Sequence, residues 1–256
     1  MLTLASSADR DRIAQFCEGS LLGAYLACRL QCYGFHFAFV KFWCAEANGA
    51  LTAVIGALDD AAILLAEEHA DHDELAAFLR MMPFSSLMMS AETAERCGFA
   101  RYSKKEALVF RGGELVGSAQ TPTDMHDVYD LISNEIPGSF SREIAARLSF
   151  LSDFMFRKNR GAARAAAVCE GGRLCACALT AAETQNAAVL SGVAADRRVR
   201  RQGYGKRVVL FLANELQREG KTVYVIALNE GAAAFYRHIG FAANQTIAII
   251  ERNPHV

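Results

Sequence analysis

The residues whose types and spacing most clearly suggest chemistry form a basic, glycine-containing loop in the second half of the chain. Residues 196–207 read DRRVRRQGYGKR and join a strand-like run to a long amphipathic helix pattern. Gly203 and Gly205 let the backbone turn sharply and present bare N–H groups to an anion. The following helix adds unpaired N–H donors and the positive end of its dipole, and arginine guanidinium groups suit phosphate geometry. The loop therefore predicts a site for a pyrophosphate carried by a larger ligand.

Two common phosphate motifs do not fit this loop. No Ser or Thr follows Gly205-Lys206, as a Walker A loop requires, and the glycines lack the spacing of a dinucleotide fingerprint. The pattern Arg200-x-x-Gly203-x-Gly205 after a strand instead resembles the signature of the GNAT superfamily of acetyl-CoA-dependent N-acetyltransferases. A downstream block is similar to that family's second motif: Asn229-x-x-Ala232-x-x-Phe235-Tyr236-x-x-x-Gly240-Phe241. Motif, strand, helix and second block occur in the family's order, so the resemblance covers the last ~135 residues.

The resemblance implies a set of cofactor-binding residues for acetyl-CoA as co-substrate. The pantetheine arm would lie along the strand that precedes the loop and form main-chain hydrogen bonds with Val193 and Ala195. A backbone N–H near Val193 would polarise the thioester carbonyl. The loop would hold the pyrophosphate, and Asn229 would contact the pantetheine or cap the next helix. The residues so implied are Val193, Ala194, Ala195, Arg200, Arg201, Gln202, Gly203, Tyr204, Gly205, Lys206 and Asn229.

The resemblance also implies direct attack of a neutral amine on the thioester, without an acyl-enzyme. Tyr236 is then the expected general acid, because a phenol can protonate a departing thiolate when it lies close to the sulfur. A core position beside Phe235 is the alternative for this ring. The base is less evident: Glu183 is the first choice, while Glu135, Glu143 or a chain of waters are alternatives. No metal site is expected.

The elements that must position these residues follow from the periodicity. Two helices are expected first, one capped by Thr123 and one carrying Ile144, Leu148, Leu151 and Met155 on one face. Gly171-Gly172 between apolar runs predicts a hairpin. A strand at 187–195, the basic loop, a helix ended by Gly220, a strand at 223–228, a helix before Gly240 and a strand at 247–250 complete the order. The prediction is a mixed α/β (α+β) fold, and the resemblance implies a GNAT-like, mostly antiparallel sheet flanked by helices.

The sequence pattern indicates that the first half is a degenerate repeat of the second. Asn48-Gly49 sits between apolar runs as Gly171-Gly172 does, and the segment 97–100 followed by 107–110 mirrors 239–242 followed by 247–250. The first half lacks the basic glycine loop. We therefore expect two tandem lobes: a degenerate GNAT-like lobe at 1–115 and an N-acetyltransferase domain at 119–256, joined by the segment 111–124.

Bulk composition limits the remaining classes. The net charge of -1 over 256 residues argues against nucleic-acid binding through overall charge, although the four arginines between 197 and 201 leave a local basic patch as an alternative. The eight cysteines match no zinc spacing and are expected to be buried, reduced thiols. The start of the chain lacks signal-peptide features, and the apolar stretch 49–66 is broken by Asp59 and Asp60. A cytoplasmic protein without a membrane partner is expected; its oligomeric state is left open.

These observations predict an N-acetyltransferase that acetylates a primary amine of a small molecule, amino acid or peptide. A non-catalytic acyl-CoA-binding regulator is the alternative, and a structural protein with a relic loop is a third hypothesis. The acceptor and the acyl-chain preference are not predicted, because loops and the first two helices set them in such folds.

Overall fold

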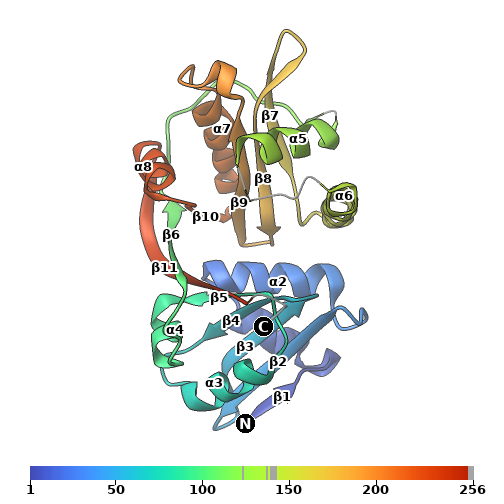
Figure 1. Cartoon of the computed structure of the whole chain (residues 1–256), viewed down its shortest axis with the longest axis vertical. Helices are drawn as coiled ribbons and strands as arrows, with labels where there is room; N and C mark the ends of the chain where they lie inside the picture. The colour runs from blue at the N-terminus through green and yellow to red at the C-terminus, as the bar shows by residue number, and fades with distance from the viewer. Residues whose placement is uncertain (123, 137, 139–142, 253–256) are drawn as a thin grey trace. The chain divides into compact units, whose positions relative to one another are not determined.

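The chain forms two compact units (Figure 1). The computed structural model describes residues 1–122, 124–136, 138 and 143–252. Unit 1 comprises 1–107, 226–233 and 243–256, and unit 2 comprises 108–225 and 234–242. Strands β6 and β11 and helix α8 therefore each begin in one unit and end in the other. Within the described residues, no helix has the length and hydropathy needed to span a bilayer.

Unit 1 is a sheet with helices in the connections between its strands. Its strand order is β1-β2-β3-β4-β5-β11, antiparallel except for the β4–β5 pair. The helices are η1(Ser7–Asp9), α1(Arg10–Phe16), α2(Leu21–Tyr33), α3(His72–Met81) and α4(Ala91–Arg96). The strands are β1(Leu2–Leu4), β2(Val40–Ala47), β3(Ala50–Leu58), β4(Ala61–Ala66), β5(Ser86–Ser90) and β11(Phe241–Glu251).

Unit 2 carries the basic loop. Its strand order is β6-β10-β9-β8-β7, with β9 parallel to β10 and antiparallel to β8. The helices are α5(Met125–Glu135), α6(Ile144–Lys158), η2(Arg197–Val199), α7(Tyr204–Arg218) and α8(Glu230–His238). The strands are β6(Ser103–Phe110), β7(Ala165–Glu170), β8(Arg173–Glu183), β9(Ala187–Ala195) and β10(Thr222–Ile226).

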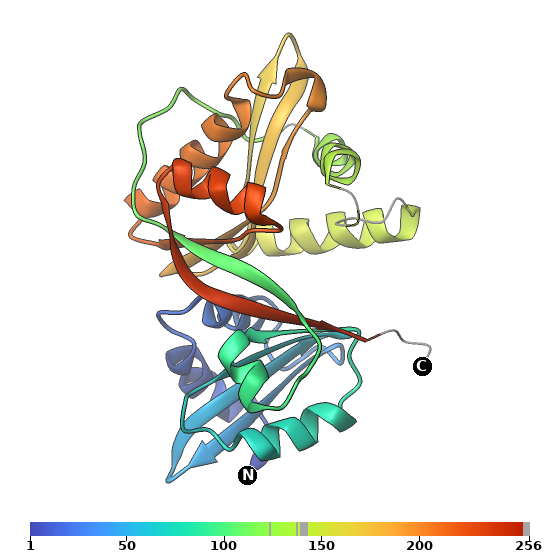
Figure 2. The same ribbon diagram turned by 60° about the vertical axis from the view of Figure 1, so that its left-hand side comes forward.

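The sheet of unit 2 is covered on both faces, which explains the unbroken apolar run in β8. Residues 175–180 are all buried, as expected for a strand with helices on both sides. Helix α5 packs its Val128, Leu131 and Ile132 stripe against Cys177 and Leu179, while α7 lies on the opposite face (Figure 1 and Figure 2). This sandwich holds the end of β9 and the start of α7 beside one another.

Most elements expected from the sequence are present, in the expected order. Both glycines of the β7–β8 turn have positive φ (57° and 77°), as do Asn48 (53°) and Gly49 (80°) in the β2–β3 turn. Gly220 (φ 81°) ends α7, with Lys221 N–H donating to the carbonyl of Leu216. Thr123, expected to cap the first helix, lies outside the described residues; Asp124 accepts a hydrogen bond from the N–H of His126 at the start of α5.

Helix α6 forms where predicted, but the apolar stripe that indicated it does not pack into the core. Ile144, Leu148 and Met155 on this stripe are 76%, 54% and 41% exposed. Phe154 and the guanidinium-bearing Arg157 are buried instead, and Arg157 donates to the carbonyl of Ala181. Periodicity identified the helix but not the face that meets the sheet, because a second apolar stripe competes with the first.

Candidate active site

A β-bulge distorts β9 just before the basic loop. Between the Cys177↔Ala194 and Leu179↔Ser191 pairs, β9 contributes one residue more than β8. Gly192 lies in this bulge with a φ of 56°, and a Cβ there would be 2.9 Å from Ile132 and from Leu179. Only glycine satisfies both the backbone and the space. The bulge therefore fixes how residues 193–195 are presented.

Strand β9 also diverges from β10 at this level. The parallel pairing runs from Ala187↔Thr222 to Leu190↔Val225 and stops there, while β9 continues to Ala195. Within the described residues, no strand pairs with residues 191–195 on the side facing β10. Backbone N–H and C=O groups must be paired or solvated, so this edge is open to a ligand that binds as an added strand. Val193, Ala194 and Ala195, all predicted from the sequence, lie on it.

The loop ends on a helix whose first turn has no side-chain cap. Gly203 is the N-cap of α7 with a φ of 83°, and Arg201 also has a positive φ of 65°. A Cβ on Gly205 would meet only the Cβ of Ala195, at 3.9 Å, which is ordinary contact. The protein's own packing therefore does not require glycine at 205. The first-turn N–H groups of α7 and the bare backbone of Gly205 form a cradle suited to an anion.

The cations of the loop differ in their partners. Arg200 lies 2.7 Å from Glu135, and Lys206 lies 2.6 Å from Glu114. Arg197 also approaches Glu135, at 3.6 Å, and Arg198 binds Asp196, whose pKa its guanidinium holds well below the usual range. The exposed Arg201 has no ion pair with any described residue. Among the loop arginines it is the cation available to a phosphate.

The remaining loop residues are either exposed or form hydrogen bonds through the ends of their side chains. Gln202 is exposed, and the hydroxyl of Tyr204 donates to Glu170. Arg207 donates from Nε to the carbonyl of Ser118 at 2.9 Å. The segment 111–122, expected as a joint, is thus tied to α7, and Gln120 bridges to Ala167 of β7. These bonds fix the start of α7 from the outside.

Tyr236 and Asn229 lie at the two ends of α8. The Tyr236 ring is 7% exposed and packs edge-on against Phe235 and Phe241, with centroids 5.3 and 5.4 Å away. Burial raises the pKa of its phenol above the ordinary value, and the hydroxyl makes no hydrogen bond with any described residue. Asn229 is exposed and accepts a hydrogen bond from the N–H of Ala232, so it caps the helix.

Glu183, predicted as the base, is the centre of a buried ion-pair network. Its side chain is 1% exposed and lies 2.5 Å from both Arg164 and Lys221, which in turn bind Glu219. A general base must reach the proton that it takes. Glu183 presents no free surface to an amine in this structure, and its role as base stays a prediction. Of the alternatives, Glu135 is held by two arginines and Glu143 is exposed.

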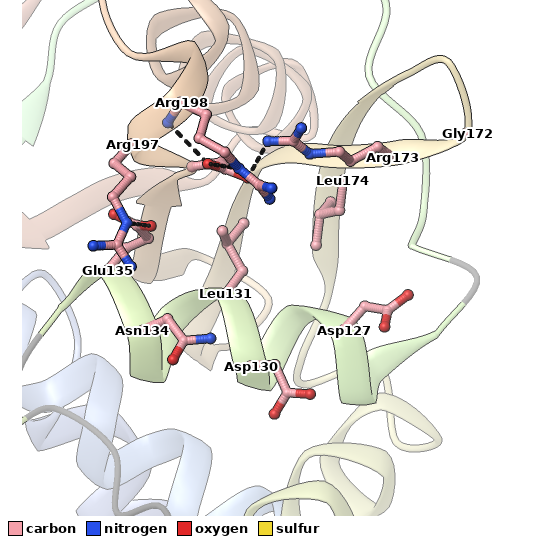
Figure 3. A pocket seen from close by; sticks show the side chains of 11 residues that line it. Asp127, Asp130, Leu131, Asn134, Glu135, Gly172, Arg173, Leu174, Arg197 and Arg198 are labelled. Carbon is pink, nitrogen blue, oxygen red and sulfur yellow. Dashed lines mark hydrogen bonds and ion pairs between the residues drawn. The ribbon is translucent and has the colours of Figure 1, made fainter.

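A cavity of about 790 Å³ opens between α5, the β7–β8 turn and the loop (Figure 3). Figure 3 shows Asp127 and Asp130 on α5 opposite Arg173 and the arginines that follow β9. Its residues are Asp127, Asp130, Leu131, Asn134, Glu135, Gly172, Arg173, Leu174, Asp196, Arg197 and Arg198. Four carboxylates face three guanidinium groups in this lining, so its formal charge is −1. The cavity contains the alternative base Glu135 but neither Tyr236, Glu183 nor any predicted cofactor-binding residue, and unlike the loop it does not favour an anion.

Comparisons with known proteins bear on the family and the fold of the chain. Residues 125–241 match the model of the acetyltransferase (GNAT) family. None of the curated proteins compared with the chain matches it.

Solved structures share the fold over the whole chain. A GCN5-related N-acetyltransferase from Sphaerobacter thermophilus is similar with a TM-score of 0.65 and 14% identity, covering 100% of this chain and 96% of that one. A GNAT-family acetyltransferase from Colwellia psychrerythraea gives 0.63 and 13%, covering 98% and 100%. A tandem GNAT protein from the clavulanic acid biosynthesis pathway gives 0.60 and 14%, covering 100% and 99%. The expected fold class, a mixed and mostly antiparallel GNAT-like sheet flanked by helices, is confirmed.

The family match spans the strand with its bulge, the basic loop and the uncapped helix. Acyl transfer with acetyl-CoA is the activity that this family suggests. The match of residues 125–241 to the GNAT acetyltransferase family thus supports an acyltransferase.

Proposed function

We propose that the protein is an acetyl-CoA-dependent N-acetyltransferase that acetylates a primary amine of a small molecule, amino acid or peptide. The observation that carries the proposal is the open edge of β9 leading directly into the uncapped N-terminus of α7. An extended ligand with a diphosphate at one end fits that combination of an unpaired strand edge and an anion cradle.

The cofactor residues follow from this arrangement. Val193, Ala194 and Ala195 bind the pantetheine arm through their main chain, and the N–H near Val193 polarises the thioester carbonyl. First-turn donors at Tyr204, Gly205 and Lys206 hold the pyrophosphate with Gln202 and Gly203. Arg201 supplies the unpaired charge, and Arg200 shapes the loop through Glu135. Asn229 contributes through the start of α8.

In the proposed reaction the neutral amine attacks the thioester carbon. The new C–N bond forms as the C–S bond breaks, and Tyr236 donates its phenolic proton to the leaving thiolate. The hydroxyl of Tyr236 has no hydrogen-bond partner among the described residues, which leaves it able to donate to the sulfur of a bound thioester. Burial raises the pKa of the phenol, so the group stays protonated in the physiological range but is a weaker acid than an exposed tyrosine. The attacking nitrogen loses one proton to solvent as the amide forms, and solvent returns one proton to the tyrosine, so the protons balance.

The proton of the acceptor ammonium needs a separate path. Glu183 is the residue predicted from the sequence, but both of its cation partners would have to release it. A water chain needs no such rearrangement. Replacing Glu183 with Gln separates the two: a base predicts a loss of kcat with a changed acid limb in the pH profile, and a structural role predicts lower stability instead.

We further propose that residues 1–115 form a degenerate GNAT-like lobe and residues 119–256 the N-acetyltransferase domain. The support is the same sequence of strands and helices in both halves, together with an acidic segment, Glu67 to Asp71, where the second half has its basic loop. The lobe then binds no acetyl-CoA. One cofactor per chain is the expected stoichiometry, and two independent sites would contradict this assignment.

Calorimetric titration with acetyl-CoA tests the cofactor site. We expect one site per chain in the native protein and an affinity at least about tenfold weaker in Arg201→Glu. Arg218→Glu is the matched control, since Arg218 is exposed at the far end of the same helix and should change little. Saturable binding that Arg201→Glu leaves unchanged would contradict the site.

Turnover distinguishes an enzyme from an acyl-CoA-binding regulator. With a panel of amines, Tyr236→Phe should lower kcat by about 10² to 10⁴-fold while leaving acetyl-CoA affinity intact. A protein that binds acetyl-CoA but acetylates no amine in the panel would be the regulator.

A further inference from the structure

Unit 1 contains a preformed, largely apolar cavity whose lining includes none of the residues proposed above for catalysis or acetyl-CoA binding. It has a volume of about 370 Å³, within the range of small-molecule sites. Its residues come only from unit 1 and are Ala38, Phe39, Lys41, Trp43, Ala57, Asp59, Phe78, Met81, Met82 and Pro83. We call it the Trp43 cavity.

Strand geometry explains why this cavity exists. Phe39, Lys41 and Trp43 alternate along one side of the chain that forms β2, so they share a face of the sheet. Lys41 lies opposite Ala57 on β3, whose methyl group cannot fill the space between the larger side chains. Helix α3 closes the other side with Phe78 and the methionines that follow.

The apolar walls are fixed before any ligand arrives. Trp43 packs on Phe78 with ring centroids 5.4 Å apart, and Phe39 packs on Phe37 at 5.1 Å and on Tyr33 at 5.9 Å. These walls nevertheless stay open to solvent: Phe39 is 42% exposed and Met81 is 78% exposed. Rigid aromatic surfaces with flexible methionine beside them suit a compact apolar group of planar or branched shape.

The rim carries one charge of each sign. Asp59 follows β3 and donates its backbone N–H to the carbonyl of Phe39 at 2.7 Å, which places it diagonally across the strand pair from Lys41. Both side chains are exposed, and neither forms an ion pair with a described residue. A ligand that brings both an ammonium and a carboxylate next to an apolar group would satisfy both charges and the cavity at once.

We propose that the Trp43 cavity binds a free amino acid with a large apolar side chain. The side chain lies between the aromatic walls, the carboxylate binds the ammonium of Lys41, and the α-ammonium binds the carboxylate of Asp59. The site is independent of the acetyl-CoA site, because all of its residues lie between 38 and 83 and the basic loop lies in unit 2.

The chain reports occupation of this cavity directly, because Trp43 is its one tryptophan. Titration of the full-length protein with L-phenylalanine should change the tryptophan emission saturably, with a Kd between about 10 μM and 1 mM. Phenylpropanoate and phenylethylamine each lack one of the two charges and should bind at least about tenfold more weakly.

Two variants and one control complete the test. Lys41→Met and Asp59→Asn should each raise the Kd for phenylalanine about tenfold or more, whereas Asp60→Asn, the next residue in the same turn, should not. Arg201→Glu should leave the response unchanged even where it abolishes acetyl-CoA binding. Unaltered affinity in both rim variants would overturn the assignment, as would the absence of both an emission change and a rise in Tm at about 20 mM phenylalanine.

Discussion

The two units share one arrangement of strands but differ at the start of the helix that follows the third strand of the repeat. In unit 1, β4 pairs with β5 only as far as Ile63↔Met88 and then continues to Ala66 paired with β3 alone. In unit 2, β9 leaves β10 after Leu190 in the same way. In both units, therefore, a pair of parallel strands separates at the same point of the sheet. The helix that follows differs, because Asp71 accepts a hydrogen bond from the N–H of Glu74 at 2.9 Å, whereas α7 begins at an uncapped glycine.

This difference in the helix N-terminus distinguishes the features common to both units from those needed to bind an anion. The diverging strands are present in both units and so belong to the fold. A capping carboxylate occupies the helix N-terminus of unit 1 and adds negative charge where an anion would bind, while unit 2 has free donors there and an arginine without an ion pair to any described residue. Anion binding in this chain is therefore expected to depend on the loop and cap rather than on the strand geometry.

The largest loss of stability is expected from removing a buried carboxylate of unit 2, whose counterpart at the corresponding turn of unit 1 is exposed. Glu183 ends β8 at 1% exposure, whereas Asp60 lies exposed in the β3–β4 turn of unit 1. Glu183→Ala leaves Arg164 and Lys221 without their shared partner and should cost about 3 to 5 kcal/mol of unfolding free energy in a urea titration. Asp60→Ala should stay within about 0.5 kcal/mol. A stable Glu183→Ala protein with lost turnover would instead favour the base role.

The bulge gives the next largest effect. Strands β3 and β4 pair without interruption, but β8 and β9 do not, and Gly192 is the residue that the irregularity requires. Gly192→Ala should destabilise by about 2 to 4 kcal/mol, from the positive φ together with the contacts to Ile132 and Leu179. Gly171→Ala, with a similar φ of 57° and open space around it, should cost only about 1 to 2 kcal/mol. If both variants lost the same unfolding free energy in a urea titration, the contacts of a Cβ at position 192 would contribute nothing.

At Gly205 stability and binding should change in opposite directions. An alanine in this first turn of α7 makes only an ordinary contact with Ala195, so Gly205→Ala should stabilise the protein by about 1 kcal/mol. The added methyl group lies where the pyrophosphate is proposed to approach, so acetyl-CoA affinity should fall about tenfold in calorimetry. Unchanged affinity would show that the glycine is not needed for the ligand.

The smallest expected effect is on how the stability of unit 2 depends on pH. Hydrogen bonds from Arg164, and then from Lys221, lower the pKa of Glu219 from 4.5 to about 2. A carboxylate with a lowered pKa stabilises the folded state above its unfolded pKa, and this contribution is lost as the pH falls from about 4.5 to about 2. Because the side chain is 42% exposed, Glu219→Gln should cost under about 1 kcal/mol near neutral pH. The difference in Tm from the native protein should shrink in acid; a constant difference would contradict the linkage.

The sequence predicted the elements far better than their partners. Gly171-Gly172, Gly220 and Gly240 mark turns and helix ends through backbone conformation, which is a local property, and the strand and helix order followed from them. The pairing of Glu183 with Arg164 and Lys221 joins residues 19 and 38 positions apart and carries no local signal. The bulge at Gly192 had one available clue, since a glycine inside an apolar strand often marks such an irregularity. For α6 the sequence offered two apolar stripes and no local signal to choose which one meets the sheet.

The last strand also constrains how this chain can fold during synthesis. Residues 247–251 of β11 pair with β5, and Ala248 and Ile250 are buried in the core of unit 1 beside Leu87. A ribosome making the chain at about 5 to 20 residues per second leaves that edge of β5 uncovered until residues 247–251 emerge. An uncovered strand edge invites pairing with other chains. Truncation after residue 246 should therefore yield a nascent protein that depends on chaperones and aggregates, even though every residue of the basic loop is intact.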